Sequence, residues 1–429
     1  MHPYLHPRDE ILQTMERIYR YRMTTTSGGN ISLREPNGDI WITPARIDKG
    51  GLRRDDIVRV RADGCVDGTR APSSEFPFHR AIYSERPDIE GIVHAHPVAL
   101  VAFSLVREVP NTRLFHRAFR VCGEAGFAPY ELPGSDKLGR NVAGTFQQGF
   151  HCVVLENHGV VTAGASLQEA FRRFETFEFT ARTVIKARLL GGRIHYLSDE
   201  ELATAQRPRL VSGPSAGDAP PPSEERELRR TLSEFITRAY RQRLFISTQG
   251  SFSARLGGDS FLITPSHADR GMIGATDLVL VSEGTVAAGA SPSSAAALHR
   301  SVYQAHPSVA AIINAYPVNA TAFSVSGEDL DTRTIPESYV VVRHPAKAQY
   351  GLQFRDPDAV ARLISSRQPA VILENDGVLV TGGSVLEAFD RLEVIESTAN
   401  ALIDSRAIGA LSPMPDEAIA ELEKVFLGM

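Results

Sequence analysis

The sequence has few cysteines and no excess of basic residues. Its 429 residues include three cysteines, Cys65, Cys122 and Cys152, an odd number without the spacing of a zinc knot. This argues against a disulfide framework and favours a reducing, cytoplasmic location. The net charge at pH 7 is −5 and no basic stripe is visible, so nucleic acid is not an expected partner.

Long hydrophobic runs are missing as well. No apolar stretch approaches the roughly 18 residues of a membrane span. The N-terminus, MHPYLHPRDE, lacks the apolar core of a secretory signal. Hydrophobic residues make up 42% and charged residues 23% of the chain, which is typical of a soluble globular protein. A chain of this length is expected to form two or three domains.

The sequence contains a long internal repeat. TSGGNIS at 26–32 matches STQGSFS at 247–253, and VVLENHGVV at 153–161 matches VILENDGVL at 371–379. The matching segments keep their order and nearly constant spacing, which indicates the tandem duplication of a whole domain. We therefore expect one domain at 1–205 and a second at 228–429. The Pro-, Gly- and Ser-rich residues 206–227 read as a linker.

Each copy shows the same coarse pattern of secondary structure. A helix is expected to open the copies at residues 7–23 and 223–243, where apolar residues recur at three- and four-residue spacing. Val- and Ile-rich runs such as 91–96 and 152–164 predict strands. A further helix is expected near the Ser73–Ser74 pair, where a serine is suited to cap it. Strands mixed with helices without strict alternation predict an α/β fold with antiparallel pairing.

Two histidines stand one residue apart in the first copy. His94 and His96 lie in a predicted strand, where side chains at i and i+2 point to one face. His158 follows another predicted strand. Three imidazoles with an open position are typical of catalytic zinc, although histidines near strands are often only structural.

The repeat separates these two interpretations. The second copy replaces all three histidines together, with Asn314, Tyr316 and Asp376, whereas His79 persists as His299. Ligands of one metal lose their purpose jointly when the site is abandoned, so the pattern predicts a metal site in the first copy only.

One carboxylate follows the histidines. Glu75 in PSSEFPFH becomes Ala295 in PSSAAALH, while both serines remain. A carboxylate beside a metal-bound substrate is suited to general acid–base catalysis, and we predict this role for Glu75. The alternative is an exposed glutamate that was replaced by chance.

The motifs GGN, ITP, PSSE, HAHP and ENHG, in this order, resemble those of the class II aldolase/adducin family. The resemblance covers most of residues 8–205 and, more weakly, 228–425. The family includes fuculose- and rhamnulose-phosphate aldolases, ribulose-phosphate 4-epimerases and related decarboxylases. The resemblance implies two tandem α/β/α sandwich domains, each with a mainly antiparallel central sheet, of which the second is degenerate.

The resemblance also implies a cofactor and a chemistry. It places Zn²⁺, or alternatively Mn²⁺, Fe²⁺ or Co²⁺, on the three histidines, with Glu75 as the acid/base. Such a metal stabilises the enediolate that remains when a C–C bond beside a carbonyl breaks. A substrate phosphate is expected at the helix and loop positions that match the family's anion site, which are Ser27, Gly28, Gly29, Asn30, Ser73 and Ser74.

The chain departs from the family after ITP. Ala45 and Arg46 stand where the phosphate aldolases carry Thr-Gly. Arg46 is either a bidentate ligand of a substrate phosphate or carboxylate, or a surface arginine. The departure leaves the identity of the substrate anion open.

The resemblance further implies an assembly. Family members form four-fold rings, so two tandem chains would fill one, and we expect a homodimer or a larger stack of such rings. In the phosphate aldolases a tyrosine from the neighbouring subunit donates a proton. The corresponding stretch of the first copy has Phe115 and His116, and that of the second has Tyr339. Tyr339 is therefore a candidate catalytic acid, or a residue that packs in the interface.

These observations predict a metal-dependent aldolase or lyase that acts on a small sugar phosphate or sugar-derived acid. The alternatives are an epimerase or decarboxylase of the same family, a metal-dependent oxygenase, and a non-enzymatic, adducin-like interaction protein. The intact Glu75 and three histidines argue against the last. The expected partner is a small molecule rather than a nucleic acid or a membrane.

Overall fold

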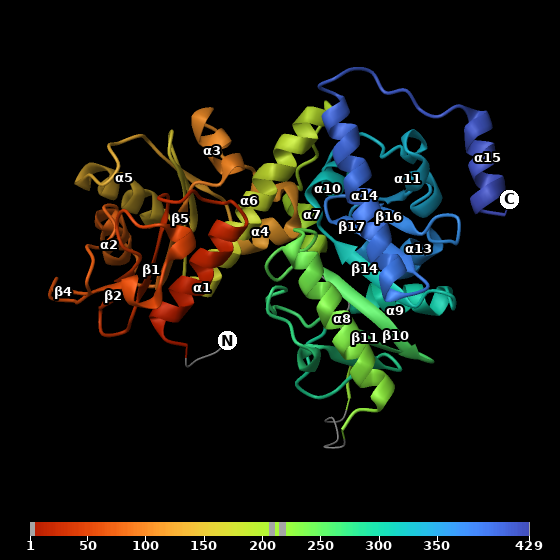
Figure 1. Ribbon diagram of the computed structural model, residues 1–429, viewed down its shortest axis with the longest axis horizontal. Coiled ribbons are helices and arrows are strands. Elements are labelled where there is room, and N and C mark those ends of the chain that lie inside the picture. The colour runs from red at the N-terminus through yellow and green to blue at the C-terminus, as the bar shows by residue number, and fades with distance from the viewer. Residues whose placement is uncertain (1–4, 206–210, 214–219, 429) are drawn as a thin grey trace. The chain divides into compact units, whose positions relative to one another are not determined.

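The computed structural model describes residues 5–205, 211–213 and 220–428, and they form two units (Figure 1). The first unit extends to residue 182 but leaves out residues 114–116. The second unit consists of 114–116 and the chain from residue 183 onward. The predicted linker lies partly outside the described residues, and the predicted domain boundaries stay predictions.

The first unit is built on an eight-stranded sheet in the order β4-β3-β2-β1-β5-β8-β7-β6. All neighbours pair antiparallel except β6 and β7, which are parallel. The strands are β1 (Asn30–Arg34), β2 (Ile40–Ile42), β3 (Val58–Val60), β4 (Val66–Asp67), β5 (Gly91–Ala95), β6 (Gly126–Ala128), β7 (Cys152–Leu155) and β8 (Gly159–Gly164). The helices are α1 (Pro7–Arg20), α2 (Phe76–Glu85), α3 (Val98–Leu105), α4 (His116–Cys122), α5 (Asp136–Gln147) and α6 (Leu167–Leu190), of which α4 and α6 each continue across the division between the units.

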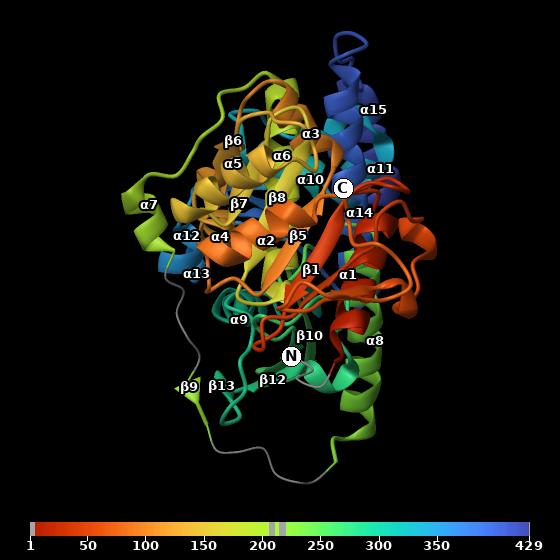
Figure 2. The same ribbon diagram turned by 90° about the vertical axis from the view of Figure 1, so that its left-hand side faces the viewer.

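Helices cover both faces of this sheet. Figure 2 shows α2 and α5 on one side of β1 and β5, and α1 on the other. Ile82 on α2 and Val142 on α5 share a buried core with Ile92 of β5 and Val161 of β8. The apolar side chains of the strands thus face helices, which shield both faces of the sheet from water. The first unit is the expected α/β/α sandwich.

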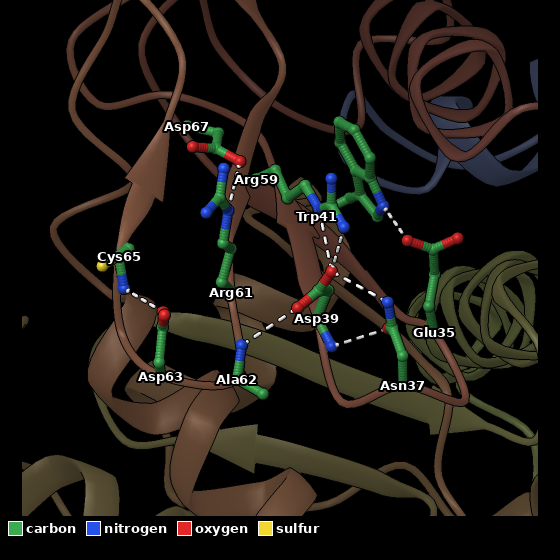
Figure 3. A network of polar contacts seen from close by, with 10 residues as sticks. All are labelled: Glu35, Asn37, Asp39, Trp41, Arg59, Arg61, Ala62, Asp63, Cys65 and Asp67. Carbon is green, nitrogen blue, oxygen red and sulfur yellow. Dashed lines mark hydrogen bonds and ion pairs between the residues drawn. The ribbon is translucent and has the colours of Figure 1, made fainter.

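A polar network holds the corner of the sheet where β2 meets β3 (Figure 3). The Asp39 carboxylate accepts hydrogen bonds from Arg59 Nε at 2.8 Å, from Asn37 Nδ2 at 2.9 Å and from the Ala62 amide at 3.0 Å. The bond from Arg59 holds the pKa of Asp39 below its usual range. The network holds β2 and β3 together at this corner of the sheet.

The second unit repeats this topology. Its sheet has the order β15-β16-β17-β14-β10-β11-β12-β13-β9, which is the order of the first sheet with β9 added at one edge. The strands are β9 (Val211–Ser212), β10 (Ser251–Gly257), β11 (Ser260–Ile263), β12 (Val279–Ser282), β13 (Thr285–Val286), β14 (Ala311–Ala315), β15 (Ala346–Ala348), β16 (Ala370–Leu373) and β17 (Gly377–Gly382). Two copies with one strand order confirm the predicted tandem form.

Helices also flank the second sheet. Val302 of α9 and Val360 of α13 pack against Ile312 of β14 in one buried core, and α8 and α14 contact β10, β14 and β17 (Figure 1). The helices are α7 (Asp199–Thr204), α8 (Ser223–Arg241), α9 (Ala296–Ala305), α10 (Val318–Val325), α11 (Pro336–Val341), α12 (Leu352–Arg355), α13 (Pro357–Arg362), α14 (Val385–Ser405) and α15 (Asp416–Phe426). Within the described ranges, no helix is long and apolar enough to cross a membrane.

One local prediction is wrong. The helix after the serine pair begins at Phe76, with Glu75 at its N-cap, and no side chain caps it. Ser73 Oγ instead accepts the Glu75 amide at 3.3 Å. Ser73 lies two residues before the cap, and the Glu75 carboxylate is bound elsewhere, so the first turn has no side-chain acceptor.

Candidate active site

Three neighbouring strands bring the predicted metal ligands together. Asn30 of β1 lies opposite His94 of β5, and His94 lies opposite Val161 of β8. His96 follows β5 immediately, and His158 lies in the turn between β7 and β8. Since these strands run antiparallel, the start of β1, the end of β5 and the start of β8 meet at one edge of the sheet.

The three imidazoles converge there. Their candidate ligand atoms all lie within 4.8 Å of one another, and Nε2 of His94 is 3.1 Å from Nε2 of His96. The His158 ring centroid is 4.9 Å from that of His94 and 5.0 Å from that of His96. His94 is fully buried, and the other two histidines are partly exposed. This convergence is what the His-x-His spacing and the joint loss in the second copy predict.

The protonation of the cluster suits a cation. His94 Nδ1 lies 2.9 Å from the Val160 carbonyl oxygen and donates to it, which leaves the Nε2 lone pair directed at the other imidazoles. Burial lowers the pKa of His96 to about 3 and the pKa of His158 to about 4. His96 and His158 therefore fit as neutral nitrogen ligands, and the ring nitrogens of His94 and His96, which face each other at 3.1 Å, are favourably placed only with a cation or a proton between them.

Glu75 lies against the same imidazoles. Its Oε2 is 3.2 Å from His94 Nε2, and its Oε1 is 3.3 Å from His158 Nε2. Asn30 Nδ2 donates to Oε2 at 2.7 Å. Burial by itself would raise the pKa of Glu75, but His94, His158 and the Asn30 amide hold it below its usual range. The N-terminus of α2 thus presents an ionised carboxylate, only 8% exposed, to the histidine cluster.

Two glycines of the first loop lie directly against the histidines. A Cβ at Gly28 would lie 2.8 Å from His96 Nδ1. Gly29 has φ of +69°, and a Cβ there would lie 2.7 Å from the His94 carbonyl oxygen. Only glycine fits both positions, so the loop backbone approaches the site closely. Ser27, the first residue of this predicted anion loop, is exposed.

The other predicted anion-binding residues lie on two adjoining loops. The Ser73 amide donates to the Thr43 carbonyl at 3.2 Å, and the Ala45 amide donates to the Ala71 carbonyl at 3.1 Å. Ser73 is buried, whereas Ser74 and Arg46 are exposed. Arg46 has φ of +50°, the left-handed region that suits the glycine of the phosphate aldolases.

Two polar residues near the site were missed by sequence reasoning. Lys49 is 3% exposed, and its ammonium donates to the Pro44 carbonyl at 3.1 Å. Burial lowers its pKa to about 8. Its amide donates to Thr26 O at 2.8 Å, which ties it to the first loop. His79 is the second, because its persistence as His299 predicts a structural role only. For Lys49, a signal was present in the sequence, because the second copy also has a basic residue, Arg270, at the matching position.

The second copy has closed the corresponding position with hydrogen bonds. Tyr316 donates to Asp376 Oδ1 at 2.8 Å, and Gln353 Nε2 donates to Asp376 Oδ2 at 3.1 Å. Asn314 Nδ2 donates to Val378 O at 3.1 Å, as His94 does to Val160 in the first copy. His116, which belongs to this unit, has Nδ1 3.9 Å from Asp376 Oδ1. Across the described residues, one group of three or more histidine, cysteine, aspartate or glutamate side chains is placed to share a metal ion. It consists of His94, His96 and His158.

Tyr339 lies on α11 of the second unit. Its hydroxyl donates to Glu423 Oε1 on α15 at 2.6 Å. This bond, with some burial, raises the pKa of Tyr339, so the phenol keeps its proton at neutral pH. Its catalytic role stays a prediction.

Comparison with known proteins gives the family of both units. The family model for the class II aldolase and adducin N-terminal domain matches residues 9–185 and 230–403. The 3-oxo-tetronate 4-phosphate decarboxylase of Escherichia coli K12 is 31% identical over 204 residues, which are 46% of this chain and 93% of that protein. The L-fuculose phosphate aldolase of the same organism is 29% identical over 197 residues, 45% of this chain and 89% of that protein.

A solved L-fuculose-1-phosphate aldolase from Thermus thermophilus is 25% identical, with a TM-score of 0.39, and covers 44% of this chain and 97% of its own. The decarboxylase and the aldolase of Escherichia coli each match a little less than half of this chain. Because the same family model matches both halves, the chain belongs to the class II aldolase and adducin family.

Proposed function

We propose that this protein is a metal-dependent lyase that acts on a small phosphorylated sugar or sugar-derived acid. The observation that carries the proposal is the convergence of three histidines and one carboxylate at one edge of the first sheet. The names of two relatives, a 3-oxo-tetronate 4-phosphate decarboxylase and an L-fuculose phosphate aldolase, support a phosphorylated substrate and bond cleavage.

The donor set fits a divalent cation. His94, His96 and His158 would hold it, and three imidazoles with an open position favour Zn²⁺ over the alternatives Mn²⁺, Fe²⁺ and Co²⁺. When bound, such an ion supplies Lewis-acid stabilisation of the negative charge that cleavage leaves on the substrate oxygens.

The chain's own residues would move the proton and bind the anion. Glu75 is the proposed acid/base, because its two carboxylate oxygens lie beside the ligand nitrogens and therefore beside a bound substrate. The loop 27–30, with Ser73 and Ser74 ahead of α2, offers amides and hydroxyls to a phosphate. Arg46, exposed on the adjoining loop, is proposed to pair with a second anionic group.

The second copy is proposed to support assembly. A homodimer that places four copies in a ring would let Tyr339 of one chain serve the metal site of another as its acid. Such an arrangement gives the degenerate copy a reason to persist without ligands of its own.

The relatives favour two reactions that one experiment separates. Purified protein is analysed for metal, loaded with Zn²⁺, and incubated with phosphorylated ketoses and phosphorylated 3-oxo acids. Release of CO₂ identifies a decarboxylase, and release of an aldehyde identifies an aldolase. Glu75→Gln, which keeps the side-chain shape, should retain metal and lose about 10²–10⁴-fold in turnover. A metal-free protein that is inert with every compound would instead support the adducin-like interaction protein.

A further inference from the structure

We propose that His79 is a positioning residue, which fixes the orientation of the Asn30 amide and through it the Glu75 carboxylate. The inference rests on the proposed function for its catalytic consequence. It goes beyond that function because the His79 ring nitrogens contact Ser32 and Asn30, so that His79 acts on Glu75 only through Asn30.

A continuous chain of hydrogen bonds leads from the core to the carboxylate. His79 lies one turn after Glu75 on α2 and is fully buried. Its Nδ1 is 2.7 Å from Ser32 Oγ, and its Nε2 is 2.5 Å from Asn30 Oδ1. Asn30 Nδ2 then reaches Glu75 Oε2 at 2.7 Å. Asn30 and Ser32 are two residues apart on β1, so both side chains face α2.

The chemistry of these groups sets the direction of every bond. An ionised carboxylate only accepts, so Asn30 must present its NH₂ group to Glu75 and its oxygen to His79. His79 must then carry its proton on Nε2, and its Nδ1 accepts from the Ser32 hydroxyl. Burial lowers the pKa of His79 to about 3, in agreement with a neutral ring that has one donor and one acceptor.

The second copy keeps the serine–histidine part of these hydrogen bonds and lacks the asparagine and the glutamate. Ser253 Oγ is 2.7 Å from His299 Nδ1 and 2.8 Å from the Tyr303 hydroxyl, as Ser32 is from His79 and at 2.8 Å from Tyr83. Asn30 and Glu75, however, correspond to Ser251 and Ala295. The serine–histidine–tyrosine contacts therefore serve the fold of both copies, and in the first copy His79 extends them through Asn30 to Glu75.

When this chain of hydrogen bonds is broken at His79, we expect the Glu75 carboxylate to lose its fixed orientation. Without the Nε2–H donor of His79, the Asn30 amide can rotate and present its oxygen to Glu75. An amide oxygen in that position repels the Glu75 carboxylate. Loss of a partner that orients a reacting group typically costs about 10–100-fold in activity. Because the three histidines and the backbone of the loop 27–30 do not change, we expect the loss in kcat and little change in KM or in metal content.

The two copies supply a matched test in the full chain. His79→Leu and His299→Leu remove the same serine contact from the same fold, so both should lower thermal stability similarly. His79→Leu should lower kcat about 10–100-fold, and His299→Leu should leave it near wild type. His79→Gln, whose amide nitrogen can replace Nε2–H, should recover most of the loss. Equal kcat in the two leucine variants, or a glutamine variant no better than leucine, would overturn the proposal.

A second measurement does not depend on turnover. In the zinc-loaded full chain labelled with ¹⁵N-histidine, NMR should show the proton of His79 on Nε2, with the signal assigned by its loss in His79→Gln. A proton on Nδ1 would overturn the positioning role. If the wild-type protein turns over no compound, the proposed function fails, while the tautomer still decides whether His79 orients Asn30.

Discussion

Asn30 and His94 face each other across β1 and β5, and Ser251 and Asn314 face each other at the same positions across β10 and β14. The backbone frame of the candidate active site is thus present in both copies, whereas the side chains that carry chemistry are present in one. Substitutions in the second copy are therefore internal controls for substitutions in the first.

The metal should depend on the first copy alone. His94→Ala, His96→Ala or His158→Ala each removes one of three ligands, so metal content measured by mass spectrometry should fall far below stoichiometric. Asn314→Ala and Asp376→Ala should leave metal content unchanged. A histidine variant that keeps near-stoichiometric metal would contradict the three-histidine site.

Restoring a metal site in the second copy should require a fourth change. Asn314→His, Tyr316→His and Asp376→His supply the ligands on the same strand frame. Gln249, however, stands where the first copy has Gly28, and a Cβ at Gly28 would lie 2.8 Å from the His96 ring. We expect the triple variant to bind no second metal ion and the variant that also carries Gln249→Gly to bind one. Second-site binding by the triple variant would show that Gln249 is no obstacle.

Lys49 should make the stability of the first unit depend on alkaline pH. Burial lowers its folded pKa from 10.5 to about 8. Between these values the unfolded chain holds a proton that the folded chain lacks, so the free energy of unfolding rises with pH across this window. Between pH 8 and 10.5, the free energy of unfolding of the wild type should rise by about 3 kcal/mol relative to that of Lys49→Met.

Trp41, the single tryptophan, lies on β2 of the first unit and reports its unfolding in urea by fluorescence. Lys49→Arg, which copies Arg270 of the second copy, stays charged over the whole range and should lack the dependence. A wild type that shows the same pH trend as both variants would rule out Lys49 as its source.

Tyr339 tests whether the second copy takes part in catalysis. Tyr339→Phe removes one hydroxyl and should lower turnover about 10²–10⁴-fold if this phenol is the acid. Metal content should persist, and light scattering should give the mass of the proposed dimer for the variant as for the wild type. Glu423→Gln, which changes the hydrogen-bond partner of Tyr339, is the matched control for loss of the local contact. Near wild-type turnover of Tyr339→Phe, or a strictly monomeric mass, would leave the second copy with a structural role.

The sequence by itself determined the duplication, and it singled out the three histidines and the carboxylate that lie together in the first unit. It did so because two copies of one domain diverged in one chain. Joint replacement of His94, His96 and His158 separates predicted ligands from structural residues, and a single copy does not permit this comparison. The α/β/α fold followed from the family motifs, and the common strand order of the two sheets agrees with it.

Only the tertiary structure revealed the contacts of Asn30, His79 and Lys49. Asn30 at the start of β1 reaches Glu75 at the N-terminus of α2, and β2, β3 and β4 lie between these two residues along the chain. Strand register and helix placement depend on which apolar faces are buried together, and residue types along the chain do not specify them. His79 therefore looked purely structural in the sequence, because its Ser32 contact recurs in the second copy and its Asn30 contact exists only where β1 and α2 face each other.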